Sequence, residues 1–376
     1  MKFQIPQKEL KLALSAVQGI AEKKSTIPVL QNILIKSVGE TGLQIIATNL
    51  DLAMTKDAKA TIERKGFICI PGRKLFEITN SLPAGDVKFE SEDNYWVKIT
   101  CGKSKFRLAG VDKDQFPEIP KPKEMPITLN GDLFAEMIGR VTFAITNESS
   151  RFTLSGAKFL VFDGKAVMVS TDGHRLSYIE RTPSEGQPDL GEEKMEVLIP
   201  KLALVEAAKM GQGGGIQLGE DANHIFFNAG GQLLSARKLM GTFPNYEMVM
   251  PKPGENDKCA TVDGGEFRSA VKRISLMADE RNRSMRITLF ENGVQLLANS
   301  KEQGEGKETI DAEYGSDEIL LGYNYHYLAD FLNLVKDDDK VVLMVKDANA
   351  QTELRFAGDD GFRHIIMPLR IDSSSL

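Results

Sequence analysis

The sequence predicts an α+β fold made of three repeated domains. Two observations support this prediction, namely an apolar pattern that occurs three times and two proline-rich joints that separate its copies. The chain has 376 residues, which is more than one ordinary domain core accommodates and also favours two or three domains. Because repetition fixes the architecture, the individual elements are best considered repeat by repeat.

The repeated pattern opens each copy. Two apolar residues at alternating positions precede five at helical spacing, which is typical of a short strand leading into an amphipathic helix. The first copy consists of Phe3, Ile5, Leu10, Ala13, Leu14, Val17 and Ile20. The same pattern returns from Ile127 to Ala144 and from Ala260 to Met277.

A second set of matching elements follows. Two strands joined by a tight turn are predicted in residues 32–49, 156–172 and 285–300, where GETG, DGK and ENG are hairpin signals. A second helix is predicted in residues 70–82, 199–210 and 325–335, with Glu77, Glu206 and Asp330 at the same place in it. The joints FPEIPKPKEMP and FPNYEMVMPKP end the first two copies. We therefore expect domains at 1–121, 126–251 and 255–376.

The composition excludes several classes of protein. Hydrophobic residues make up 41% and charged residues 27%, as in soluble globular chains. No apolar run approaches the ~20 residues that cross a bilayer, and MKFQIPQKEL is unlike a signal peptide. Three scattered cysteines (Cys69, Cys101 and Cys259) predict a cytoplasmic protein without a disulfide framework or zinc ribbon. The net charge of −6 is unlike the basic balance that is usual for proteins that bind nucleic acid.

The segment TDGHRLS, residues 171–177, is the strongest candidate for chemistry. However, the chain has no G-x-S-x-G elbow for a Ser-His-Asp triad, and Asp172 and His174 lack a third metal ligand at suitable spacing. The run GQGGG is not a phosphate-binding loop. We therefore predict no catalytic residue, no metal and no other cofactor. A binding turn is the better interpretation, because Gly173 lets the chain turn where a side chain would obstruct a partner.

Several motifs in this order resemble the bacterial sliding clamp family, the β subunit of DNA polymerase III. They are MKF and TIPVLQNILI near the start, TDGHRLS in the middle, GTFPNYEMVMP at the second joint and IIMPLRI near the end. The resemblance therefore covers nearly the whole chain.

The resemblance implies a non-catalytic processivity factor for DNA replication. Two identical subunits would form a head-to-tail ring around double-stranded DNA, with helices inside and sheets outside. Such heterologous contacts close only if the rotation per unit divides the circle. Implied partners are the replicative polymerase, the clamp loader, repair polymerases and ligase, each through a short linear peptide, and no membrane. The remaining alternatives are a repeat-built peptide-binding scaffold that does not encircle DNA, and an enzyme of unknown reaction.

A ring would reconcile the acidic balance with DNA binding, because cations could gather on the helices that face the hole. Such contacts go to phosphates and carry no sequence information. The expected DNA-binding residues are Lys24, Arg73, Lys74, Arg140, Lys201, Arg268 and Lys272.

Two further sets of residues are implied by the resemblance. The expected dimer interface combines basic, acidic and apolar side chains, namely Ile78, Lys103, Lys105, Phe106, Leu108, Leu276, Met277, Glu302 and Glu305. The expected peptide pocket has an apolar floor of leucines, with donors from His174 and Arg175 at its edge. Its residues are Leu154, Thr171, Gly173, His174, Arg175, Leu176, Pro244, Val249, Asn324, Tyr327, Met367, Pro368, Leu369 and Arg370.

Overall fold

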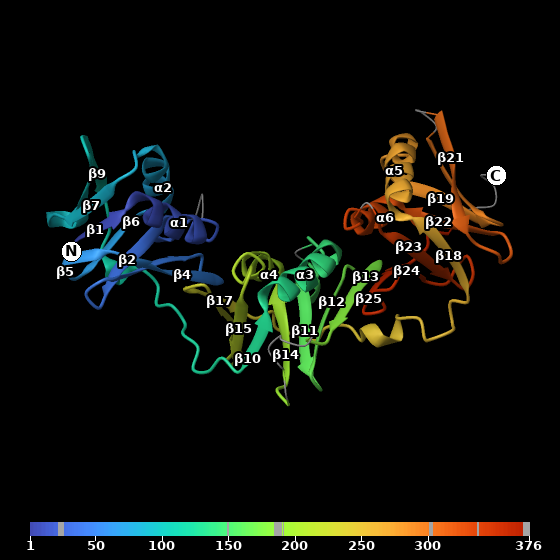
Figure 1. Ribbon diagram of the computed structural model, residues 1–376, viewed down its shortest axis with the longest axis horizontal. Coiled ribbons are helices and arrows are strands. Elements are labelled where there is room, and N and C mark those ends of the chain that lie inside the picture. The colour runs from blue at the N-terminus through green and yellow to red at the C-terminus, as the bar shows by residue number, and fades with distance from the viewer. Residues whose placement is uncertain are drawn as a thin grey trace. The chain divides into compact units, whose positions relative to one another are not determined.

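The computed structural model describes residues 1–21, 26–148, 150–183, 190, 192–300, 304–336 and 338–370. It contains two compact units (Figure 1). The first comprises Met1–Ala135, Pro183–Glu193 and Leu202–Lys238, and the second comprises Glu136–Thr182, Lys194–Lys201 and Leu239–Leu376. The middle third of the chain therefore contributes strands to both units.

The first unit contains two antiparallel sheets. The five-stranded sheet has the order β5 (Thr61–Arg64), β1 (Lys2–Pro6), β7 (Asp86–Ser91), β8 (Trp96–Cys101) and β9 (Ser104–Ala109). The eight-stranded sheet has the order β10 (Ile127–Asn130), β15 (Gly215–Glu220), β16 (His224–Ala229), β17 (Gln232–Arg237), β4 (Leu52–Lys59), β3 (Gly42–Thr48), β2 (Asn32–Val38) and β6 (Phe67–Pro71). The larger sheet thus joins strands of the first and second repeats.

The second unit contains one twelve-stranded antiparallel sheet. It begins with β14 (Met195–Pro200), β11 (Gly156–Phe162), β12 (Lys165–Thr171) and β13 (Arg175–Arg181). It continues with β25 (Phe362–Ile366), β24 (Thr352–Phe356), β23 (Lys340–Val345) and β18 (Lys258–Asp263). It ends with β21 (Gly304–Glu313), β20 (Gly293–Ser300), β19 (Ser284–Phe290) and β22 (Ile319–Asn324). The pairing of β13 with β25 joins the second and third repeats.

Helices follow the strands at the predicted places. The first helix of each repeat is α1 (Gln7–Val17), α3 (Gly131–Val141) or α5 (Gly264–Ile274), and the second is α2 (Gly72–Ser81), α4 (Lys201–Ala207) or α6 (Tyr325–Leu332). All residues of the repeated apolar pattern except Met277 are buried. The pattern therefore marks the side of each strand and helix that faces the core. Helices α1 and α2 pack side by side in the first unit, as do α5 and α6 in the second (Figure 1).

Local side-chain bonds fix several helix starts. Asp263 accepts a hydrogen bond from the backbone N–H of Glu266 at the start of α5, and Asn324 accepts one from His326 at the start of α6. Such caps satisfy amides that the first helical turn leaves unpaired. Among the described residues no helix is both long and apolar enough to span a bilayer.

Candidate functional site

The segment TDGHRLS forms a tight turn between β12 and β13. The Thr171 hydroxyl donates to the Arg175 carbonyl (2.6 Å) and accepts from the Gly173 amide (3.0 Å). The Asp172 carboxylate accepts from the amides of His174 (3.0 Å) and Arg175 (3.1 Å). Gly173 has φ +90°, a backbone conformation that favours glycine. Asp172 therefore holds the turn.

The first repeat contains the same turn between β3 and β4. The Thr48 hydroxyl donates to the Leu52 carbonyl (2.9 Å) and accepts from the Leu50 amide (3.0 Å). The Asn49 side chain accepts from the amides of Asp51 (3.1 Å) and Leu52 (2.7 Å). Since Asn49 accepts the same kind of backbone hydrogen bonds as Asp172, these bonds hold the loop in shape and do not require a carboxylate.

Arg175 points inward from this turn. Its guanidinium donates to Asp172 (3.0 Å), to Asp330 of α6 (2.6 Å) and to the carbonyl of Phe143 (2.6 Å). It also lies 4.7 Å from the centre of the Tyr327 ring. The sequence suggested that Arg175 offers donors at the edge of a pocket. Instead, its donors fasten the turn to α6 and orient Tyr327.

An apolar cluster lies beside the turn. It consists of Leu154, Val169, Leu176, Phe243 and Ile365, with Tyr178, Leu198, Tyr246 and Met250 packed against it. The structure thus brings Leu154 and Leu176 together, as the sequence suggested. Sequence reasoning did not include the aromatic members or Ile365. The signals that could have identified them are the joint FPNY and the apolar pair Ile365 and Ile366 at the end of β25.

The C-terminal segment runs along the same surface. The Met367 amide donates to the His174 carbonyl (3.0 Å), and the Leu369 amide donates to the Gly322 carbonyl (2.8 Å). Met367, Leu369 and Val249 are all exposed, whereas the leucines of the cluster are buried. The exposed His174 ring stacks on Tyr327 with centroids 6.4 Å apart. The turn, the start of α6 and the C-terminal segment therefore form one surface, which we call the turn surface. Pro244 lies in the same joint as Val249, and Pro368 and Arg370 lie on the C-terminal segment.

The cations suggested for DNA binding differ in their surroundings. Arg73 and Lys74 of α2 both bind Glu77, at 3.0 and 2.7 Å. Lys201 donates to the Asn147 side chain (3.1 Å), and Arg268 donates to the Val335 carbonyl (2.7 Å). Lys272 is exposed on α5. Lys24 lies outside the described residues.

Arg140 is packed rather than presented to solvent. Its guanidinium lies 4.4 and 4.6 Å from the ring centres of Phe356 and Phe362. Burial lowers the pKa of Arg140, although Glu136 and Asp359 oppose that shift. This placement favours a structural role for Arg140 over a contact with DNA.

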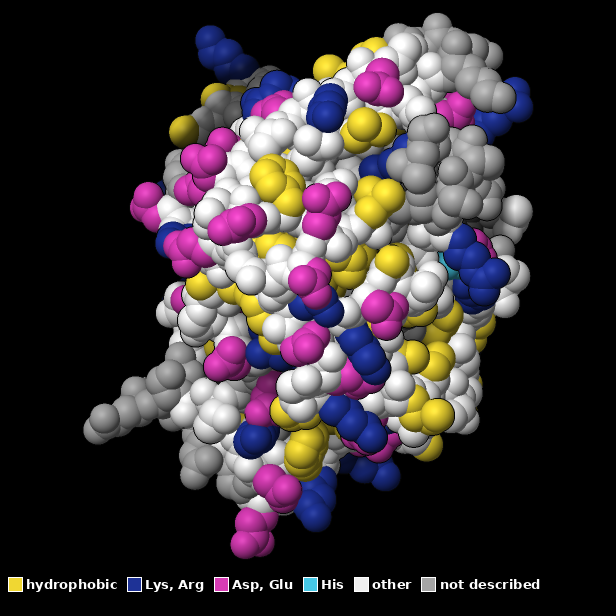
Figure 2. Space-filling model, turned by 90° about the vertical axis from the view of Figure 1, so that its right-hand side faces the viewer, with side chains coloured by type: hydrophobic (Ala, Val, Ile, Leu, Met, Phe, Trp, Pro, Cys, Tyr) yellow, Lys and Arg dark blue, Asp and Glu magenta, His cyan; other side chains and the backbone are white. Residues whose placement is uncertain are grey.

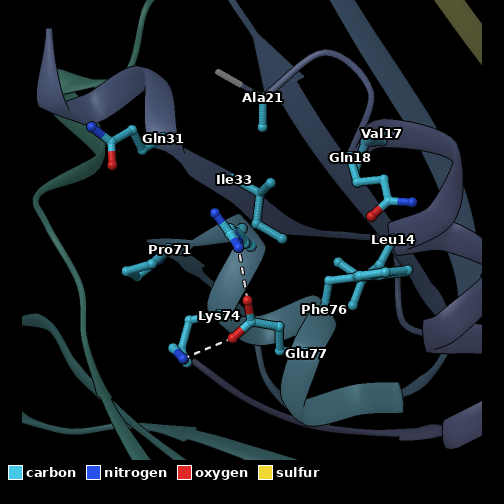
Figure 3. A pocket seen from close by; sticks show the side chains of 12 residues that line it. Leu14, Val17, Gln18, Ala21, Gln31, Ile33, Pro71, Lys74, Phe76 and Glu77 are labelled. Carbon is cyan, nitrogen blue, oxygen red and sulfur yellow. Dashed lines mark hydrogen bonds and ion pairs between the residues drawn. The ribbon is translucent and has the colours of Figure 1, made fainter. Parts of the chain in front are cut away.

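The paired helices of the first and third repeats enclose grooves. The groove between α1 and α2 has a volume of about 590 Å³, an apolar floor that includes Leu14, Ile33 and Phe76, and Lys74 and Glu77 at its rim (Figure 3). The groove between α5 and α6 has a volume of about 520 Å³ and carries Arg268 and Lys272. On the face drawn in Figure 2, acidic and basic side chains are interspersed with small hydrophobic areas, so neither sign of charge dominates it.

The residues suggested for a dimer interface lie on several elements of both units. Phe106 and Leu108 of β9 are half-buried, whereas Lys105 of β9 and Lys103 in the turn before it are exposed. In the second unit Leu276 is 74% exposed and Met277 packs beside Gly304 and Gly306. Ile78 is buried and Glu305 is exposed. Glu302 lies outside the described residues.

The described residues hold no group of three or more His, Cys, Asp or Glu side chains that could bind a metal ion. Cys69 and Cys101 are free and buried, and Cys259 is free and exposed. Burial raises the pKa of the Cys69 thiol to about 12, so this sulfur is not an activated nucleophile.

Comparison with known families assigns all three repeats. Residues 1–120 match the N-terminal domain of the DNA polymerase III beta subunit, residues 128–245 match its central domain, and residues 248–370 match its C-terminal domain. The chain belongs to the DNA polymerase III beta subunit family. Membership makes it a sliding clamp, the non-catalytic processivity subunit of a DNA polymerase.

Relatives of the family are similar over their full length. The beta sliding clamps of Pseudomonas putida and Caulobacter vibrioides are each 29% identical to this chain, and each comparison covers 99% of this chain and 100% of the relative. The crystal structure of the Pseudomonas aeruginosa subunit has a TM-score of 0.92 at 26% identity, covering 99% of this chain and 100% of that one. A P. aeruginosa sliding clamp bound to griselimycin has a TM-score of 0.91 at 26% identity, with the same coverage. The three-repeat α+β fold predicted for this family is thereby confirmed.

Proposed function

We propose that two copies of this chain close head to tail into a ring that encircles duplex DNA and tethers a polymerase and other partners through their linear peptides. The observation that carries this proposal is the way in which the repeats are joined. Strand β17 of the second repeat pairs with β4 of the first, and β25 of the third repeat pairs with β13 of the second. One kind of joint therefore occurs twice within the chain.

The strands at this joint occupy equivalent places in their repeats. Strand β9 is the last of the neighbouring strands β1, β7, β8 and β9, just as β17 and β25 are the last strands of the equivalent series in the second and third repeats. Likewise, β21 occupies in the third repeat the place that β4 and β13 occupy in the first and second. In the part of the chain that the structure describes, β9 pairs only with β8, and β21 pairs with β20 and, at its end, with β18. The edge of β9 and the edge of residues 304–311 in β21 could therefore pair in the same way as the strands of the two internal joints. Pairing β9 of one copy with β21 of a second copy would form this third joint.

The internal joints also predict the register of this seam. Leu234 faces Met54 in the first joint, and His364 faces Ser177 in the second. In the first repeat, residues that face one another on neighbouring strands form a row that runs from Phe3 through Phe89 and Ile99 to Phe106. The equivalent row of the second repeat runs from Ile127 to Leu234, and that of the third runs from Ala260 to His364. Phe106 is therefore equivalent to Leu234 and His364. Rows of facing residues can be followed in the same way across the strand series that end in β4, β13 and β21. They show that Gly306 is equivalent to Met54 and Ser177.

Phe106 of one copy would therefore face Gly306 of the other, and Arg107 would face Glu305. Met277 already packs against Gly306, so the Phe106 ring would add to an apolar contact there. An opposite-charge pair across antiparallel strands adds a small favourable contribution. Both features support this register, and Leu108, Leu276 and Met277 would supply further apolar contact.

The paired helices would line the hole in this arrangement. Phosphate contacts from Arg73, Lys74, Lys201, Arg268 and Lys272 would be independent of sequence. A weak grip suffices, because a closed ring slides along a duplex without dissociating from it, whereas each phosphate contact is weakened by salt.

The turn surface is the proposed site for partner peptides. Leu154 and Leu176 would form its floor, with Thr171, Gly173, His174, Pro244, Val249, Asn324, Tyr327, Met367, Pro368, Leu369 and Arg370 around it. Two apolar anchors would contribute roughly 3–6 kcal/mol before ordering costs. Weak binding of this kind lets several partners exchange at one surface, and exposed methionine adapts to different side chains.

The proposal extends to domain bounds of 1–121, 126–251 and 255–376 and to a cytoplasmic location, which the free thiols support.

Retention on DNA of different topology tests the ring directly. Clamp loaded by its clamp loader onto nicked circular DNA should remain bound during gel filtration at physiological salt. Linearising the circle with a restriction enzyme should release it, because the ring can then slide off an end. Equal retention before and after linearisation would contradict encirclement and favour ordinary adhesion.

A further inference from the structure

Two cations of the α1–α2 groove are already bound by the protein itself. Glu77 accepts from Arg73 at 3.0 Å and from Lys74 at 2.7 Å, and all three side chains are exposed on one face of α2 (Figure 3). The spacings are i,i+4 and i,i+3, which place the side chains next to one another on a helix. One carboxylate therefore occupies two groups that could each bind a phosphate.

The second repeat carries a related ion pair. Glu206 of α4 accepts from Lys209, which lies just after that helix, at 2.7 Å. In the third repeat Asp330 of α6 binds Arg175 instead, which anchors the turn surface. Each second helix thus carries a carboxylate that binds a cation, and in the first two repeats that cation lies on the same helix or just after it.

The carboxylate stays ionised at neutral pH. Hydrogen bonds from Lys74 and then Arg73 lower the pKa of Glu77 below its ordinary value. The rim of the groove consequently presents one net positive charge in place of two. Since a phosphate and a carboxylate use the same donors, a DNA phosphate must displace Glu77 or remain at a distance from these cations.

We propose that Glu77 is an intramolecular competitor for DNA phosphates, which masks Arg73 and Lys74 and keeps the grip of the clamp on duplex DNA weak. This inference rests on the proposed DNA-encircling function. It assigns to Glu77 a role that its cationic neighbours alone do not predict, because the phosphate contacts proposed for Arg73 and Lys74 form only in part while the carboxylate competes for the same donors.

Glu77→Gln tests the inference, with Glu63→Gln as the matched control. Glu63 is an exposed carboxylate of β5 that binds Lys2 at 2.9 Å, so the control changes the net charge equally and also releases one lysine. Binding of the clamp to a short fluorescent duplex is measured by anisotropy over a range of salt concentrations. Protein concentrations are those at which sedimentation shows the same oligomer for every variant.

Glu77→Gln should bind duplex several-fold to about tenfold more tightly than the unmodified chain at moderate salt. The slope of log K against log salt should steepen by about 1 to 2, because each additional phosphate contact contributes about 0.9. Glu63→Gln should change neither quantity by more than about twofold. A gain in Glu77→Gln no larger than that in Glu63→Gln would overturn the inference.

Removing the cations in both backgrounds gives a second, independent test. The double substitution Arg73→Gln with Lys74→Gln should weaken binding only slightly when Glu77 is present, and it should abolish the gain when Glu77 is glutamine. Equal losses in the two backgrounds would show that the cations contact DNA without being masked, and would also overturn the inference. Failure of the unmodified clamp to stay on nicked circular DNA would instead count against the ring itself.

Discussion

The guanidinium of Arg175 lies 2.6 Å from the carboxylate of Asp330, joining the turn between β12 and β13 to helix α6. These residues are far apart in the sequence and belong to different repeats. The pair is partly buried and is completed by Asp172 and by the Phe143 carbonyl. Arg175 therefore links the turn to α6 beneath the turn surface, and its loss should destabilise the turn more than the rest of the chain.

Arg175→Ala should loosen the turn without unfolding the chain. Leaving two carboxylates and a carbonyl without their donor costs about 2 kcal/mol. Amide hydrogens of residues 172–176 should then exchange roughly thirtyfold faster. Arg237→Ala is the control, since Arg237 and Asp51 form a loose pair (3.9 Å) that is largely exposed. Equal exchange rates in the Arg175 variant and the unmodified chain would refute the role assigned to this arginine.

The seam proposed between β9 and β21 depends chiefly on apolar contact, because exposed ion pairs contribute only about 0–1 kcal/mol each. Phe106→Ala or Leu108→Ala should therefore convert dimers to monomers in sedimentation velocity. Phe67→Ala, which removes another exposed aromatic ring of the first unit, should leave the dimer intact. An intact dimer in both seam variants would argue against this interface.

The register of the seam can be tested by the same reasoning with cysteines. Arg107→Cys combined with Glu305→Cys should give a disulfide-linked dimer under mild oxidation, because facing positions in antiparallel strands bring their Cβ atoms within reach of a disulfide. Arg107→Cys combined with Lys307→Cys, two residues away along β21, should cross-link poorly. The reverse preference would show that the internal joints do not predict the seam.

The turn surface should bind a synthetic linear peptide of the kind proposed for the polymerase partner. Met367→Glu places a charge on an exposed apolar position of this surface and should weaken binding by more than about tenfold in calorimetry, because a buried charge without a partner is costly. Phe162→Glu, at the tip of the β11–β12 hairpin, should bind like the unmodified chain. Unchanged affinity in Met367→Glu would place the ligand elsewhere.

His364 should make the second unit sensitive to acid. The ring is fully buried, stacks on Phe331 (ring centroids 5.5 Å apart) and packs at a tilt against Phe143 (5.0 Å). Burial and, secondarily, the Arg175 charge lower the pKa of His364 to about 3. Between about pH 6.5 and pH 3 the unfolded chain therefore binds a proton that the folded chain excludes. Stability should be retained above pH 6.5 and should fall by up to about 1.4 kcal/mol per pH unit below it.

His364→Leu provides the comparison, because Leu234 occupies the equivalent position in the first unit. Unfolding midpoints in urea, measured from pH 7 to pH 4, should fall less steeply in this variant than in the unmodified chain. Parallel pH profiles for the two proteins would mean that other groups determine the acid sensitivity.

The fold followed from the sequence because the repeated pattern reports burial directly. Residues such as Phe3, Leu10 and Leu14 are buried on one face, and burial imposes a period that the sequence must carry. The lengths of the larger sheets did not follow, since the pairing of β17 with β4 and of β13 with β25 depends on contacts between repeats that no local period encodes.

For the candidate site, the sequence predicted which residues lie together better than it predicted what each residue does. Leu154 and Leu176 do lie in one apolar cluster. By contrast, the sequence suggested that Arg175 and Arg140 are surface cations. The sequence alone does not show which carboxylates and aromatic rings contact them in the folded chain. Their inward placement depends on Asp330 and Phe356, both far along the chain.

The two matching threonine turns have a consequence for engineering. The scaffold at residues 48–52 is made by hydrogen bonds that Asn49 supplies without a charge, while its outward positions carry Leu50 and Asp51 in place of glycine and histidine. The molecule thus contains an internal reference, because the two turns share their backbone hydrogen bonds but present different side chains to solvent. Exchanging only those outward side chains would separate what the loop geometry contributes to partner capture from what histidine and glycine contribute.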